Sequence, residues 1–208
     1  MNIRGIIIVA VTASAAGAGF YVYQQRNRPV PVPLPAAPIP TAKLAATVPD
    51  FSLADRTGQM RSLHDWHGKA LIVNFWATWC APCRKEIPLL QKLQRERASE
   101  GFQVVGIAAD FRDKVLAYAD EMKIEYPLLI GEQEALDAAA AFGVEAVGFP
   151  FTIFTDTRGR IVVAHMGELT QAEADLILGT VRAVDAGQQT LEQARAHIES
   201  GLADLPQA

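Results

Sequence analysis

Asn74-Phe75-Trp76-Ala77-Thr78-Trp79-Cys80-Ala81-Pro82-Cys83 is the stretch that decides the fold, because it joins an apolar run to an amphipathic one. The apolar run over residues 70–76 is typical of a strand buried on both faces of a sheet. Residues 82–98 show helical periodicity, with Ile87 and Leu90 on the stripe that contains Cys83. The two cysteines therefore lie where a buried strand passes into a helix.

These cysteines are the only two in the chain, and two residues separate them. In the chain-entropy picture, a disulfide closing so short a loop stabilises a fold by only about 2 kcal/mol, against about 4.7 kcal/mol for a hundred-residue loop. The spacing suits reversible exchange, because one thiol can attack a mixed disulfide held by the other. We therefore interpret the pair as a redox-active dithiol.

The junction also assigns a role to each sulfur. Cys80 is expected at the helix N-terminus, where unpaired backbone N–H groups and the helix dipole stabilise a thiolate. Such surroundings lower a cysteine pKa from about 8.5 into the range of about 3.5–7.5. Cys80 is therefore predicted to be the exposed nucleophile. Cys83, one turn into the helix, is predicted to be the more buried resolving thiol.

Strand and helix patterns alternate along the rest of the chain. Strands are predicted over 48–53, 70–76, 102–109, 127–130, 151–155 and 161–165, and helices over 82–98, 112–122, 134–142, 170–184 and 190–200. The last two strands are close enough in sequence to form an antiparallel hairpin. This order predicts an α/β fold in which helices flank a central mixed β-sheet.

The N-terminal region precedes this domain and has a different composition. Residues 5–23 carry no charge, and nineteen residues can just span a bilayer core of about 30 Å. Residues 1–28 are interpreted as an uncleaved signal anchor, with a signal peptide cleaved after Ala15 or Ala18 as the alternative. The apolar run continues past both cleavage sites, which favours the anchor.

Three further segments complete the predicted organisation. Residues 29–47 are rich in proline and are interpreted as a semi-rigid linker, with a proline-motif ligand as the alternative. Residues 48–186 form the domain. Residues 187–208 are expected to form a solvated, amphipathic helical tail.

Composition excludes some functions. The chain has 208 residues and a net charge of −4 with acids and bases interspersed, so it lacks the basic patch that nucleic-acid binding requires. The four histidines have no metal-ligand spacing to the cysteines, and no metal site is predicted.

The motif around the cysteines, followed by Glu86-Ile87-Pro88, resembles the TlpA/ResA-type thiol-disulfide oxidoreductases of the bacterial cell envelope. The resemblance extends from about residue 48 to 184 and implies a thioredoxin-like fold. In such proteins a cis-proline faces the dithiol, and Pro150 in Gly148-Phe149-Pro150-Phe151-Thr152 matches it. A cis bond there exposes the Phe149 backbone to an extended substrate segment.

The same resemblance draws attention to an acid. Thioredoxin itself has a buried aspartate where this chain has Asn74, whereas the envelope proteins carry an acid on the helix, which Glu86 matches. We hypothesise that Glu86 is partly buried, has a raised pKa and tunes Cys83, which shares its helix face. The alternative is a solvated helix charge.

Other residues near the dithiol are assigned to the substrate surface or to packing. Trp79 precedes the nucleophile and is expected to shape the surface that substrates meet. Pro82 lies between the two cysteines, and Phe149 is either a substrate contact or a packing residue.

The resemblance implies an enzyme that reduces disulfides in client proteins, such as apocytochromes c or copper-site proteins, with electrons from a membrane donor. It would need no cofactor beyond the Cys80–Cys83 disulfide and would be anchored in the inner membrane with its domain facing the periplasm. Two alternatives remain. The Val48-Pro49-Asp50-Phe51 opening resembles peroxiredoxins and suggests peroxide reduction, although the Trp-Cys-x-Pro-Cys motif argues against it. The two thiolates could instead bind Cu(I), but the methionines do not cluster.

Overall fold

The computed structural model describes residues 44–144 and 148–205. The predicted signal anchor, and the predicted linker up to residue 43, lie outside the described residues. Within the described part of the chain, no helix is both long and apolar enough to cross a membrane.

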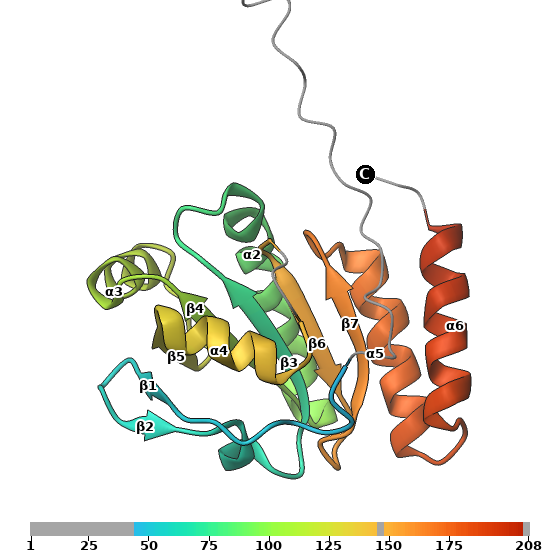
Figure 1. The fold of residues 1–208 in the computed structure, drawn as a ribbon. Coiled ribbons are helices and arrows are strands. Elements are labelled where there is room, and N and C mark those ends of the chain that lie inside the picture. Colours follow the sequence, from blue (N-terminus) through green and yellow to red (C-terminus); the bar gives the residue numbers. More distant parts are fainter. Residues whose placement is uncertain (1–43, 145–147, 206–208) are drawn as a thin grey trace, which may run out of the picture. The chain divides into compact units, whose positions relative to one another are not determined.

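A seven-stranded mixed sheet runs through these residues in the order β2-β1-β5-β4-β3-β6-β7 (Figure 1). Its strands are β1 (Leu53–Asp55), β2 (Met60–Arg61), β3 (Ala70–Trp76), β4 (Phe102–Ala109), β5 (Leu128–Gly131), β6 (Phe151–Thr155) and β7 (Ile161–Met166). Strands β3, β4 and β5 are parallel, and every other pairing is antiparallel. The mixed sheet and the antiparallel hairpin β6–β7 are confirmed.

The helices cover both faces of this sheet. They are α2 (Ala81–Arg97), α3 (Arg112–Glu121), α4 (Gln133–Ala141), α5 (Gln171–Asp185) and α6 (Leu191–Asp204). Alternate residues of the central strand β3 point to opposite sides, so that Ile72 and Trp76 pack in the cluster with α2, α3 and α5. Val73 and Phe75 pack in the cluster with α4. All seven residues of β3 are buried, as the apolar run predicts.

The beginning of the domain differs from the prediction. The first strand was expected over 48–53, but β1 begins only at Leu53, because Pro49 has no N–H to pair and the Val48 N–H bonds to Gly159 O at 2.9 Å. The chain joins the fold before residue 48, since Ala45 N–H donates to Phe142 O at 3.0 Å. A short 3₁₀ helix over Leu63–Trp66, capped by Ser62, was not predicted.

The C-terminal helix also differs from the expectation of a solvated tail. One face of α6 is buried through Ala194, Ile198 and Leu202. Arg195 donates hydrogen bonds to Ile161 O at 2.8 Å and to Val162 O at 3.2 Å on the edge strand β7. The helix is amphipathic as predicted, but its apolar stripe packs into the core beside α5 (Figure 1).

Candidate active site

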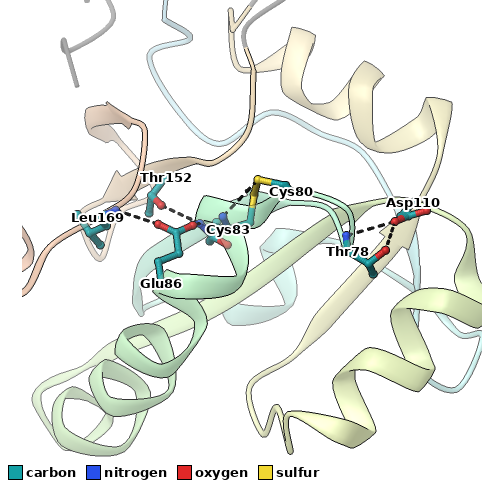
Figure 2. Close-up of a disulfide and its surroundings, with 8 residues drawn as sticks. Thr78, Cys80, Cys83, Glu86, Asp110, Thr152 and Leu169 are labelled. Atoms are coloured by element: carbon teal, nitrogen blue, oxygen red, sulfur yellow. Dashed lines mark hydrogen bonds between the residues drawn. A yellow bond between two sulfur atoms is a disulfide. The ribbon is translucent and has the colours of Figure 1, made fainter. Parts of the chain in front are cut away.

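The two cysteines form a disulfide at the start of α2, with their Cα atoms 5.3 Å apart (Figure 2). Strand β3 ends at Trp76, and Cys80 is the N-cap residue of α2. Its Sγ accepts a hydrogen bond from the Cys83 N–H at 3.2 Å. Pro82 fits in the first helical turn, where no intrahelical partner exists for an N–H group. The strand-to-helix junction therefore presents the sulfur of Cys80 to the backbone donors that stabilise a thiolate.

The two sulfurs differ in accessibility. Cys80 is 5% exposed and Cys83 is fully buried, whereas Trp79 beside them is 67% exposed. Of the two cysteines, only Cys80 presents any accessible surface. Cys83 is the more buried of the two, as predicted, but Cys80 is itself buried rather than exposed as expected from the sequence.

A buried carboxylate holds the loop that leads to Cys80. Asp110, which follows β4, accepts hydrogen bonds on Oδ2 from the Thr78 N–H at 3.2 Å and from the Thr78 hydroxyl, and on Oδ1 from the Phe111 N–H at 2.7 Å. Because β3 and β4 are parallel neighbours, their carboxyl ends meet at one edge of the sheet. Sequence reasoning missed Asp110, although its position directly after a buried strand was a usable signal.

Glu86 lies on α2 one turn after Cys83 and is only 1% exposed. Its Oε1 accepts a hydrogen bond from Asn74 Nδ2 at 2.7 Å. Its Oε2 accepts one from the Leu169 N–H at 2.9 Å (Figure 2). Burial raises the pKa of Glu86 to about 7, with a smaller contribution from the Glu168 charge, and the two hydrogen bonds oppose this rise. The solvated-charge interpretation of Glu86 is therefore wrong.

A row of polar residues continues from Glu86 across the sheet. Asn74 on β3 pairs in register with Thr152 on β6, which pairs with His165 on β7. Asn74 Nδ2 also donates to Thr152 Oγ1 at 3.0 Å. The pKa of the buried His165 imidazole is lowered by burial, and the carboxylate of Glu173, 3.8 Å away, opposes this effect. Thr152 and His165 were not among the predicted site residues.

The opposite wall of the site is the loop before β6. The Phe149–Pro150 bond is cis, as expected from the resemblance. Phe151 pairs with Phe75 near the end of β3, so the preceding Pro150 lies at the end of the sheet where the chain turns towards Cys80. The half-buried Phe149 ring lies 6.0 Å from the Trp79 ring, measured between centroids. The fold thus brings Trp79, the dithiol and the proline loop together.

The residues that the structure describes include no group of three His, Cys, Asp or Glu side chains that could hold a metal ion.

Comparison with known proteins agrees with this chemistry. The sequence profile of the AhpC/TSA family matches residues 44–164. The thioredoxin-like protein YneN of Bacillus subtilis is 37% identical over 131 residues, which are 61% of this chain and 74% of YneN. The thiol-disulfide oxidoreductase ResA of Geobacillus thermodenitrificans is 27% identical over 140 residues, which are 67% of this chain and 78% of ResA.

A solved structure gives the same result for the fold. The secreted thiol-disulfide isomerase of Corynebacterium glutamicum superposes with a TM-score of 0.57 at 25% identity. The match covers 82% of this chain and 95% of that protein.

Proposed function

Since the chain belongs to the AhpC/TSA family and is a thiol-disulfide oxidoreductase of the ResA type, we propose that it reduces disulfides in client proteins through Cys80 and Cys83. The observation that carries this proposal is the position of Cys80, which caps α2, is the more exposed of the two sulfurs and lies beside the exposed Trp79.

The reaction begins with the reduced dithiol. The Cys80 thiolate attacks one sulfur of a client disulfide, so that a Cys80–client bond forms, the client S–S bond breaks and the released client thiolate takes up a proton. The Cys83 thiolate then attacks the Cys80 sulfur and releases the second client thiol. The client gains two electrons and two protons, and the protein is left with the Cys80–Cys83 disulfide. A dithiol donor at the membrane must reduce this disulfide for another turnover.

Glu86 supports the second step. Cys83 must lose its proton before it can attack, and a buried carboxylate with a pKa of about 7 lies one helical turn away. Glu86 accepts the Cys83 proton, while Asn74 holds the carboxylate in place by the 2.7 Å hydrogen bond. In this role Glu86 acts as a general base for the resolving thiol.

The proposed setting is the outer side of a bacterial inner membrane. Residues 1–28 anchor the chain, residues 29–43 form a spacer, and the domain faces the periplasm. Support comes from the uncharged N-terminal run and from the relative that is described as secreted. The candidate clients are apocytochromes c before haem attachment and proteins that receive copper.

Trapping of the intermediate tests this function. The Cys83→Ser variant, reduced and mixed with a protein disulfide, should accumulate a covalent complex that dithiothreitol releases, because the resolving thiol is missing. The matched Cys80→Ser variant should form none. If only the Cys80→Ser variant formed the covalent complex, the roles of the two thiols would be reversed. If neither variant formed it, the proposal would be contradicted.

The same preparations separate the two alternatives. Oxidation of reduced wild-type protein by hydrogen peroxide should be slow compared with oxidation by a protein disulfide. The reverse order would favour peroxide reduction. If reduced wild-type protein binds Cu(I) no more tightly than the Cys80→Ser variant does, the dithiol is not a copper carrier.

A further inference from the structure

Large apolar side chains gather on the surface next to the dithiol. Among the described residues, four such side chains are markedly exposed, and three of them, Trp79, Phe111 and Leu136, line one groove. Phe149 lines it as well, and the groove has a volume of about 410 Å³. Contiguous exposed apolar surface of this kind marks binding sites in soluble proteins.

Four separate parts of the chain build this groove. Trp79 comes from the loop before the nucleophile and Phe149 from the proline loop, whereas Phe111 caps α3 and Leu136 lies on α4. The α3–α4 wall lies outside the dithiol motif and the proline loop. Side chains on this wall can therefore be substituted without altering the dithiol motif.

The groove begins at the residue that precedes Cys80. In a mixed disulfide the client cysteine is bonded to Cys80, so the client residues on either side of it must pass over the adjoining surface. An extended chain advances about 3.3 Å per residue, which places a side chain two residues from the client cysteine about 7 Å away. The groove is thus within reach of the client segment that carries the attacked cysteine.

The charged residues of the groove indicate which client side chains it can bind. Asp110 and Glu132 are the two acids that line the groove. Glu132 is exposed and has no ion pair within 4.0 Å in the described ranges 44–144 and 148–205. Lys114, whose Nζ lies 4.8 Å from the Phe111 ring centroid, places a positive charge beside α3, whereas Glu132 places a negative charge at the N-terminus of α4. The rim near Glu132 therefore favours a basic side chain.

Resting on the proposed function, we propose that this groove binds the client segment next to the attacked cysteine, and that it selects a large apolar residue followed by a basic one. Leu136 and Phe111 contact the apolar side chain, and Glu132 pairs with the basic side chain. These residues determine specificity and take no part in the exchange of disulfide bonds.

Three disulfide probes test this proposal with the reduced wild-type protein. The first is the disulfide-linked dimer of the hexapeptide Gly-Cys-Gly-Leu-Lys-Gly, the second has glycine in place of leucine, and the third is hydroxyethyl disulfide, which is too small to occupy the groove. In each reaction one probe disulfide becomes two thiols and the Cys80–Cys83 disulfide forms. Stopped-flow tryptophan fluorescence measures the rate.

The expected result is that the leucine peptide reacts about tenfold faster than the glycine peptide, as burial of one leucine side chain allows. The Leu136→Glu variant should lose this preference, and Phe111→Ala should reduce it. The matched control Met60→Glu, which changes an exposed apolar residue outside the groove, should keep it. All four proteins should reduce hydroxyethyl disulfide at one rate, which shows that the variants are folded and active.

Charge reversal tests the second half of the proposal. Glu132→Lys should favour a peptide with glutamate in place of lysine over the lysine peptide, whereas wild-type protein should show the opposite order.

The proposed role of the groove would be overturned if wild-type protein reduced the leucine and glycine peptides at equal rates. It would also be overturned if the Leu136→Glu variant kept the preference for leucine. Either result would leave the redox function intact. Failure of wild-type protein to reduce hydroxyethyl disulfide would instead overturn the proposed function itself. A wild-type dimer that Leu136→Glu converts to a monomer would place a second copy of the chain in the groove and also overturn the proposal.

Discussion

Asn74 on β3 donates a 2.7 Å hydrogen bond to the carboxylate of Glu86 on α2. An amide cannot supply or accept the proton of the resolving thiol, but it can hold in place a carboxylate, for which we propose that role. The ionisable group, Glu86, therefore lies on α2, the helix that carries Cys83, and Asn74 on β3 fixes its position.

The pH dependence of stability should report the burial of Glu86. Its pKa is about 7 in the folded protein and near 4.5 in the unfolded chain. Between these pH values the folded state holds one more proton than the unfolded state, so the free energy of unfolding falls as the pH rises. The loss is complete above about pH 7 and amounts to about 3 kcal/mol, since one pKa unit is worth about 1.4 kcal/mol.

Urea unfolding of the oxidised protein at pH 4.5 and pH 8 measures this effect. The Glu86→Gln variant should lack it, so the stability difference between the variant and wild-type protein should change by about 3 kcal/mol between the two pH values. A difference that does not depend on pH would show that Glu86 titrates normally.

The kinetics of the resolving step should depend on the same group. The attack of Cys83 on a preformed Cys80 mixed disulfide should accelerate as the pH rises through about 7, because the ionised Glu86 accepts the proton of Cys83. Glu86→Gln should slow this step about 100-fold or more at pH 7 and remove the inflection in the plot of rate against pH. The matched control Glu96→Gln alters an exposed acid of the same helix and should behave as wild type. An inflection that survives in Glu86→Gln would assign it to another group.

Asp110 should be needed for the stability of the active-site loop. The Asp110→Ala variant leaves the backbone N–H groups of Thr78 and Phe111 without their partner, and we expect a loss of about 1–3 kcal/mol in the free energy of unfolding. Thr78→Val removes only the hydroxyl bond and should cost about 1 kcal/mol. Chemical denaturation of both variants checks this order, and equal losses would mean that the backbone hydrogen bonds contribute little.

Sequence patterns predicted the parts of the fold that depend on residues close together in the chain. The apolar run of β3 and the helical stripe of α2 placed the cysteines correctly, because strand and helix periodicity are local properties. The burial of Glu86 was also anticipated, but only through the resemblance, and its role toward Cys83 stays a proposal.

The partners of these residues could not be predicted, because they come from distant parts of the chain. Leu169 binds Glu86 through its backbone N–H, which has no signature in the sequence, and Thr152 reaches Asn74 only through the pairing of β3 with β6. The burial of α6 was missed for the same reason. Its apolar stripe was evident, but the surface that it covers is formed by α5 and β7.

Ile198 provides a test of whether α6 belongs to the folded domain. It is fully buried, and the Ile198→Ala variant should lower the free energy of unfolding by about 2–5 kcal/mol. The neighbouring exposed residue Glu199 is the control, and Glu199→Ala should change stability by less than about 0.5 kcal/mol. If Ile198→Ala left the free energy of unfolding unchanged, α6 would be a tail that does not contribute to the stability of the domain.

The reduction potential of the Cys80–Cys83 pair decides whether the protein reduces or introduces disulfides. The described domain would be equilibrated with thiol–disulfide buffers of known potential, and the fluorescence of the exposed Trp79 would follow the redox state, with Trp79→Phe to assign the signal. We predict a value near about −270 mV, the region of thioredoxin, as expected of a protein that reduces client disulfides. A value near about −120 mV, the region of strong periplasmic oxidants, would mean that the protein introduces disulfides and would contradict the proposed direction of electron flow.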